Sequence, residues 1–214
     1  MKKILQQNYA FLFPYFLFLL FAGIFLTIHS KAEAHLIINK FSSEFCDYFF
    51  YYITYLGDGI AVVIMVVLLC FVKFRFAILL TVSNIMSSLI TQLLKRTVFE
   101  NIDRPTLFFG NSVHLKLVPW AETYIYNSFP SGHTTVAFTT FFCFALILEN
   151  KLLKFFMFLI ALTIGFSRVY LSQHFLNDVY AGSIIGVLIS FVVFYFMERL
   201  GKVNWMEKSM VKLK

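Results

Sequence analysis

A histidine and an aspartate at helical spacing are the first residues in this chain that could carry chemistry. Residues 167–178 read Ser-Arg-Val-Tyr-Leu-Ser-Gln-His-Phe-Leu-Asn-Asp, which places Arg168, His174 and Asp178 between two long apolar segments. If a helix begins at His174, Asp178 lies four positions later on the same face, where its carboxylate can orient and polarise the imidazole. His174 is therefore a candidate nucleophile or general base.

A second histidine follows a Ser-Gly pair further upstream. Residues 127–133 read Asn-Ser-Phe-Pro-Ser-Gly-His, and another apolar segment begins there. The backbone amides of Ser131 and Gly132 can face an anion, because a helix N-terminus has unpaired N–H groups and a partial positive charge. His133 is a candidate acid and base for the same reaction.

Cations lie at the end of a third apolar segment, where Lys95 and Arg96 are followed by Arg104. Charged groups at membrane depth are costly, so such a cluster indicates a functional site. The sequence has no spaced set of Asp and Glu for Mg²⁺ and no Gly-x4-Gly-Lys-Ser loop. The charge of a phosphate would then be met by guanidinium, ammonium and backbone amides. These features predict phosphoryl transfer without a metal or other cofactor.

The motifs resemble those of the type 2 phosphatidic acid phosphatase family of integral-membrane lipid phosphatases. Soluble relatives of that family include bacterial acid phosphatases and vanadium haloperoxidases. The family pattern is K-x6-R-P, then P-S-G-H, then S-R-x5-H-x3-D. Residues 130–133 and 167–178 match the second and third motifs without a gap, and the resemblance covers residues 57–186.

The first motif departs from the family pattern, because eight residues separate Lys95 from Arg104 and seven separate Arg96 from Arg104. A loop can absorb two extra residues. We predict that Lys95 has the role of the family's lysine, because it follows the apolar run directly and a flexible ammonium tolerates altered spacing better than a planar guanidinium fork. Arg96 would then face headgroups or solvent.

The resemblance implies a mechanism in which His174 attacks phosphorus to form a phosphohistidine. Asp178 would orient that histidine, and His133 would protonate the departing alcohol or phosphate. The implied catalytic residues are His174, His133 and Asp178, and the implied phosphate-binding residues are Lys95, Arg104, Ser131, Gly132 and Arg168.

Composition indicates a polytopic membrane protein. The chain is 60% hydrophobic, 20% aromatic and only 14% charged, whereas soluble domains are about 25% charged. The net charge of +7 is explained by membrane topology and not by nucleic acid, because no basic run is interleaved with aromatic residues. The three scattered cysteines predict neither a disulfide framework nor a metal site. We predict one membrane domain over residues 1–214, with its core at 51–199 and a basic cytoplasmic tail at 200–214.

Hydropathy predicts an all-α bundle of six transmembrane helices, each near the roughly 20 residues that cross a bilayer core. The predicted spans are residues 9–28, 51–72, 76–94, 131–148, 152–168 and 178–197. Residues 31–47 predict an amphipathic helix at the membrane interface, where His29 and His35 would be interfacial polar residues. The polar segment 95–129 would form a loop region over the active site. Asp58, between two glycines, is predicted to be a turn or cap residue.

Six spans place both termini on one side of the membrane, together with eleven of the eighteen basic residues. The excess of Lys and Arg makes that side cytoplasmic. Every motif then falls on the outer face. The predicted location is the bacterial inner membrane, with the active site facing the periplasm or the outside.

Several functions remain open at this stage. A lipid phosphatase fits all the motifs, and its substrate could be undecaprenyl pyrophosphate, phosphatidylglycerol phosphate, phosphatidic acid or a lipid A phosphate. A lipid phosphotransferase would pass the same phosphate to another lipid. The six spans argue against a haloperoxidase, and the sequence shows no inverted repeat of the kind that supports a transporter. The oligomeric state is not predicted.

Overall fold

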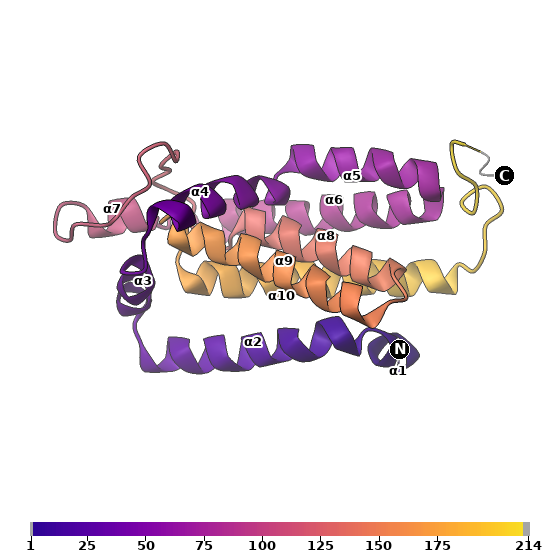
Figure 1. The fold of residues 1–214 in the computed structure, drawn as a ribbon, viewed down its shortest axis with the longest axis horizontal. Helices are drawn as coiled ribbons and strands as arrows, with labels where there is room; N and C mark the ends of the chain where they lie inside the picture. Colours follow the sequence, from indigo (N-terminus) through magenta and orange to yellow (C-terminus); the bar gives the residue numbers. More distant parts are fainter. Residues whose placement is uncertain (1, 212–214) are drawn as a thin grey trace.

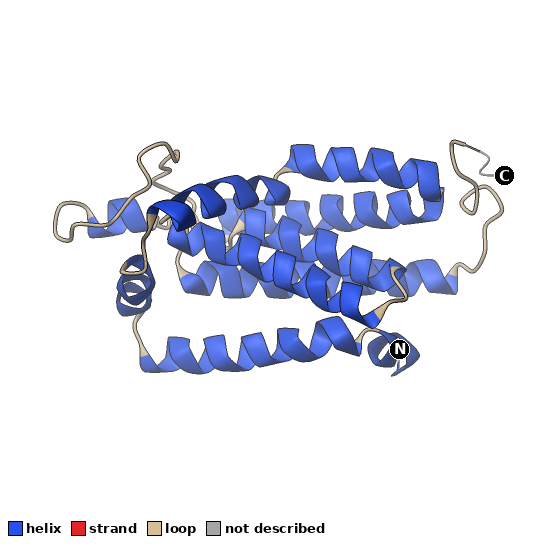
Figure 2. Ribbon diagram, in the orientation of Figure 1, coloured by secondary structure: helices blue, strands red, loops and turns tan. Residues whose placement is uncertain are grey.

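The computed structural model describes residues 2–211, and within that range every regular element is a helix (Figures 1 and 2). The elements are α1 (Lys2–Gln7), α2 (Tyr9–Ile28), α3 (Lys31–Asn39), α4 (Glu44–Ile53), the 3₁₀ helix η1 (Thr54–Gly57), α5 (Gly59–Val72), α6 (Phe74–Thr97), α7 (Pro105–Phe109), α8 (Gly132–Ile147), α9 (Lys151–Tyr170) and α10 (Leu176–Arg199). The all-α class predicted from the sequence is therefore confirmed.

Four helices are long and apolar enough to cross a membrane, namely α2, α6, α9 and α10. Glu44–Gly57 and Gly59–Val72 together form a fifth candidate span, which bends by 58° at the break between them. The remaining predicted span, residues 131–148, corresponds to α8, which has only 16 residues. At 1.5 Å per residue α8 rises about 24 Å, less than the roughly 30 Å hydrocarbon core of a bilayer. The described residues thus give up to five candidate spans, and six stays a prediction.

Helix α8 lies at the centre of the bundle and packs against α6, α9 and α10. Two glycines of α10 allow the closest approach. A Cβ atom added at Gly182 would lie 2.7 Å from the Ser131 carbonyl oxygen, and one at Gly186 would lie 2.7 Å from the Thr135 carbonyl oxygen. Small residues four apart let helix backbones meet in lipid, where the hydrophobic effect does not drive helix association. This contact brings the start of α8 against the start of α10.

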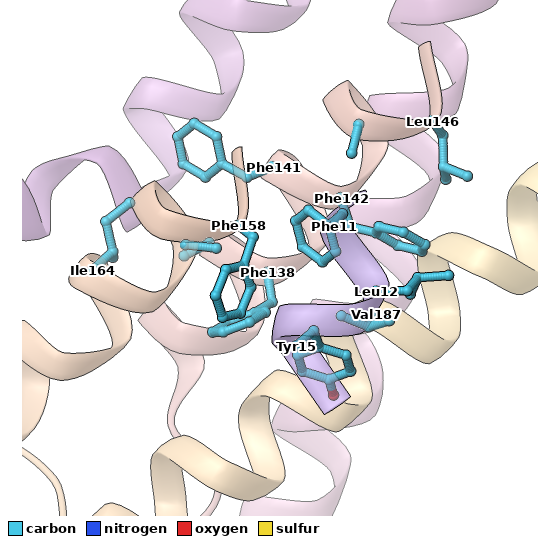
Figure 3. Close-up of a cluster of buried hydrophobic side chains, with 13 residues drawn as sticks. Phe11, Leu12, Tyr15, Phe138, Phe141, Phe142, Leu146, Phe158, Ile164 and Val187 are labelled. Carbon is cyan, nitrogen blue, oxygen red and sulfur yellow. The ribbon is translucent and has the colours of Figure 1, made fainter. Parts of the chain in front are cut away.

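Aromatic side chains join α2 to the other helices (Figure 3). The Phe11 ring lies 4.9 Å from the Phe142 ring of α8 and 5.7 Å from the Phe158 ring of α9, measured between centroids. Tyr15 lies 5.6 Å from Phe138. Tilted and edge-on aromatic pairs each contribute about 0.5–1.5 kcal/mol beyond area burial. Much of the high phenylalanine content of the chain is explained by this cluster and the lipid-facing surface.

The part predicted as one amphipathic helix, residues 31–47, is two helices in the structure. Ser30 caps α3, because its hydroxyl accepts a hydrogen bond from the Glu33 amide, and Ser43 caps α4 in the same way through the Cys46 amide. Each N-cap starts a new helix, so the prediction of a single interfacial helix is wrong. Figure 1 shows α3 and α7 at one end of the bundle and α1 at the other.

The segment after α10 folds back onto the turn between α5 and α6. Glu207 accepts a hydrogen bond of 2.8 Å from Lys73 and lies 3.6 Å from Arg75. The Arg75 amide also donates to the Met206 carbonyl. The predicted basic tail is thus docked on the bundle over its described part, whereas Lys212 and Lys214 lie outside the described residues.

Candidate active site

The predicted motifs meet at the end of the bundle where α6 and α9 end and where α8 and α10 begin. A cavity of about 310 Å³ lies there. Its wall contains six of the eight predicted site residues: Lys95, Arg104, Gly132, His133, Arg168 and His174. A neighbouring cavity of about 260 Å³ shares part of this wall, including His133 and Arg168.

His174 lies in the turn between α9 and α10 and is 1% exposed. Its Nδ1 atom is 3.3 Å from the Asp178 Oδ2 atom. The predicted pair therefore forms, but the helix begins at Leu176, after the histidine, and not at His174. The pairing survives because the Asp178 carboxylate folds back and accepts a hydrogen bond of 3.0 Å from the Phe175 amide.

The Asp178 carboxylate is held by a further group that sequence reasoning missed. Ser128 donates its hydroxyl to Oδ2 at 2.5 Å. With the carboxylate fixed against Nδ1 of His174, the Nε2 atom is the free ring nitrogen. That atom lies 3.4 Å from Nη1 of Arg104, so it faces the position where an anion held by Arg104 would lie.

The surroundings of His174 favour the neutral imidazole that a nucleophile requires. Burial, followed by the positive charges of Arg104 and Lys95, holds the pKa of His174 well below its usual range. The imidazole is therefore neutral near pH 7, since its protonated form is disfavoured. A neutral imidazole keeps the lone pair that attack on phosphorus needs.

Three cations line the same cavity as His174, and each is anchored to a neutral oxygen. Lys95 donates to the Asn127 carbonyl at 2.8 Å, and Arg104 donates through Nε to the Tyr126 carbonyl at 2.8 Å. Arg168 donates to the Thr54 hydroxyl at 2.7 Å. None of these anchors cancels the charge, so the cavity keeps a strong positive field.

Arg168 has an unused donor. Its Nε atom is buried and has no hydrogen-bond partner among residues 2–211. Buried donors are normally paired, and a missing partner is costly. An anion in the cavity would supply an acceptor.

Lys95 and Arg96 face different surroundings. The Lys95 residue is 7% exposed and lines the cavity, whereas Arg96 is exposed. The extra residues before Arg104 lie in a loop that includes Asn101 in the left-handed region, at φ 56°. The Arg104 amide closes this loop on the Ile125 carbonyl. The insertion is absorbed in the way that the sequence analysis expected.

Ser131 is placed differently from the prediction. Its amide donates to the Asp178 carbonyl at 3.0 Å, and its hydroxyl accepts from the Thr134 hydroxyl at 2.8 Å. The Ser131 amide is already paired, so the prediction that it faces an anion is wrong in this structure. The residue instead ties the start of α8 to α10, while Gly132 lines the cavity.

His35, predicted to be an interfacial polar residue, is fully buried. Its Nε2 atom lies 3.1 Å from the hydroxyl of Ser172 in the turn that carries His174. Burial lowers the pKa of His35 to about 4, so the ring is neutral. The prediction failed because α3 packs on the active-site turn, a contact 137 residues apart in sequence.

Comparison with known proteins identifies the family. The model of the PAP2 superfamily matches residues 76–202. Undecaprenyl-diphosphatase BcrC of Bacillus subtilis is 29% identical over 119 residues, and lipid A 1-phosphatase of Rhizobium johnstonii is 30% identical over 117 residues. These matches cover 56% and 55% of this chain and 56% and 46% of the relatives, so the chain spans about half the length of the curated relatives it matches.

Two crystal structures share the fold. LpxE of Aquifex aeolicus has a TM-score of 0.67 and 27% identity, covering 75% of this chain and 92% of that one. A transmembrane PAP2-type phosphatidylglycerolphosphate phosphatase of Bacillus subtilis has a TM-score of 0.66 and 21% identity, covering 88% and 96%. The matched family model, which spans more than half of the chain and includes Lys95, Arg104, His133, His174 and Asp178, shows that the protein belongs to the PAP2 superfamily.

Proposed function

We propose that this protein is an integral-membrane lipid phosphatase that works through a phosphohistidine at His174. The observation that carries the proposal is the geometry of that histidine. Its Nδ1 atom is held by Asp178, and its Nε2 atom faces a cavity walled by Lys95, Arg104 and Arg168. The named relatives, which act on phosphorylated membrane lipids, support the same class of reaction.

In the first step the lone pair on Nε2 of His174 attacks phosphorus. The phosphorus–oxygen bond to the lipid breaks, and its electron pair goes to the leaving oxygen, which takes a proton from His133. Asp178 stabilises the positive charge that develops on the imidazole. Lys95, Arg104 and Arg168 stabilise the charge on the phosphoryl oxygens as it redistributes.

In the second step a water molecule attacks the phosphohistidine. His133, now neutral, takes a proton from the water, and the phosphorus–nitrogen bond breaks with its electron pair returning to His174. Inorganic phosphate leaves, and both histidines regain their starting states. A lipid hydroxyl or phosphate in place of water would make the enzyme a phosphotransferase, which is the alternative function.

We further propose that this reaction is independent of metal. Three fixed cations already oppose the charge of a phosphate, and preorganised charge is effective in a site that excludes bulk water. The substrate class comprises lipid monophosphates and pyrophosphates: phosphatidic acid, phosphatidylglycerol phosphate, lipid A phosphate and undecaprenyl pyrophosphate.

The test is phosphate release by the purified protein from each of these lipids in one detergent, with EDTA present. At least one lipid should release phosphate at the same rate with and without EDTA. His174→Ala should reduce release to background, because it removes the nucleophile, while His114→Ala, at an exposed loop histidine, should leave the rate unchanged. Activity above a few per cent in His174→Ala would refute the assignment. Transfer of phosphate to a second lipid would favour the phosphotransferase.

Lys95 and Arg96 provide a matched pair for the first motif. Lys95→Ala should lower turnover by about 10²-fold, which is typical for loss of one preorganised charge donor. Arg96→Ala should cost less than about fivefold, because an exposed charge contributes little. Rates are measured on the preferred lipid after equal thermal unfolding temperatures have been confirmed. A larger loss for Arg96→Ala would give the binding role to Arg96.

We also propose that the site faces the periplasm of the bacterial inner membrane, with α8 as a short sixth span. Four basic residues lie at the end of the bundle opposite the start of α8 and α10 (Figure 1). Lys73 lies between α5 and α6, Arg75 lies in the first turn of α6, and Lys151 and Lys154 lie in the first turn of α9. Positive residues favour the cytoplasmic side.

This topology predicts which loop positions an impermeant thiol reagent can reach in intact spheroplasts. With the three native cysteines replaced by alanine, Asn111→Cys in the loop after α7 should be labelled. Glu149→Cys, in the turn between α8 and α9, should be labelled only after the membrane is permeabilised. Labelling of Glu149→Cys alone in intact spheroplasts would place the active site on the cytoplasmic side.

A further inference from the structure

The structure contains a second pair of a carboxylate and an imidazole beside the cavity. The Nε2 atom of His133 lies 2.5 Å from the Oδ1 atom of Asp58. Both side chains are about one-third exposed, at 32% and 34%, and both line each of the two neighbouring cavities. The motifs that identify the site do not include Asp58, which the sequence analysis expected to be a turn or cap residue.

Asp58 occupies the N-cap position of α5 but does not make the hydrogen bond of a capping side chain. It is the N-cap residue of α5, with extended φ and ψ of −89° and 154°, but its side chain makes no hydrogen bond to the first turn of that helix. A capping aspartate normally accepts such a bond and contributes about 0.5–2 kcal/mol. Here the carboxylate points to His133, so helix capping does not explain the residue.

The backbone at Gly57, the residue before Asp58, packs closely against the start of α8. A Cβ atom added at Gly57 would lie 2.9 Å from Cγ2 of Ile164 and 3.1 Å from the carbonyl oxygen of His133. Only glycine allows this approach without movement. In the same 3₁₀ turn, Thr54 accepts the hydrogen bond of Arg168, so η1 contacts two of the cavity's side chains at once.

We propose that Asp58 is the positioning residue of His133. This role rests on the proposed phosphatase mechanism. It gives each histidine its own carboxylate, so that Asp178 orients His174 and Asp58 orients His133. The Asp58 carboxylate accepts a hydrogen bond from Nε2–H, which fixes the ring and leaves Nδ1 to exchange a proton with the leaving oxygen and then with water. A carboxylate in this position also stabilises the imidazolium that must form in each cycle.

The groups around His133 include several positive charges, and protonation of its ring therefore needs a carboxylate partner. The cavity wall brings Arg168 from α9, Lys95 from α6 and Arg104 from the loop before α7 to the same space, with Tyr124 and His174. Glu122 lines the adjoining cavity. The positive charges oppose a protonated imidazole by Coulomb repulsion. Asp58 is the carboxylate in contact with His133, and it offsets that repulsion.

The test compares two substrates that differ in how much they need an acid. Dodecyl phosphate releases an alkoxide, which must be protonated, whereas 4-dodecyl-2-nitrophenyl phosphate releases a stabilised phenolate. The quantity measured is kcat/KM, which reports only steps up to formation of the phosphohistidine. In Asp58→Asn, kcat/KM should fall by about 10²-fold for the alkyl phosphate, the lower range of general acid catalysis, and by less than about threefold for the aryl phosphate.

The ratio of the two values does not depend on how much of the variant is folded, because the concentration of active enzyme cancels. His133→Ala should show the same selective loss, and Glu44→Gln, which removes an exposed carboxylate from α4, should leave both values unchanged. An equal loss on both substrates in Asp58→Asn, complete loss included, would overturn the positioning role. Failure of the wild-type protein to release phosphate from either substrate and from all four lipids of the function test would refute the proposed phosphatase function itself.

Discussion

The concentration of positive charge in one half-buried cavity is the constraint on which the rest of the structure depends. Lys95, Arg104 and Arg168 repel one another, and burial makes each charge more costly. The chain meets this cost with neutral oxygens from Asn127, Tyr126 and Thr54, which hold the three side chains without cancelling their charge. A bound phosphate would relieve this repulsion, so the three cations would also contribute to substrate binding. Burial, together with the same positive charges, lowers the pKa of His174 and keeps its imidazole neutral.

The helical bundle serves this site through a few close contacts. Gly182 and Gly186 bring α10 against α8, and the Ser131 amide then reaches the Asp178 carbonyl. This hydrogen bond joins the second motif directly to the third, although Ser131 and Asp178 are 47 positions apart in the sequence. The turn that carries His174 is supported from the other side by His35 of α3. Catalytic groups held in this way lose little conformational entropy when substrate binds.

Sequence reasoning found the parts of the site that depend on local spacing. The offset of four positions from His174 to Asp178 predicted their contact, and the position of Lys95 at the end of an apolar run agrees with its burial. Thr54, Ser128 and Asp58 were missed because their partners are between 50 and 114 residues away in the chain. Nothing in local composition distinguishes such residues from ordinary turn and cap residues. Similarly, one serine at position 43 was not enough to predict a helix boundary within residues 31–47, where the amphipathic pattern suggested a single helix.

The central claim is that the phosphoryl group passes through His174, and trapping that intermediate tests it most directly. Enzyme mixed with ³²P-labelled lipid phosphate and quenched within milliseconds in alkali should carry an acid-labile, alkali-stable label, as a phosphohistidine does. Peptide mass spectrometry should place the label on residue 174, and neither His174→Ala nor an unlabelled chase should retain it. Label on His133, or hydrolysis at the full rate with no phosphoenzyme at any quench time and unaltered activity in His174→Ala, would contradict the account.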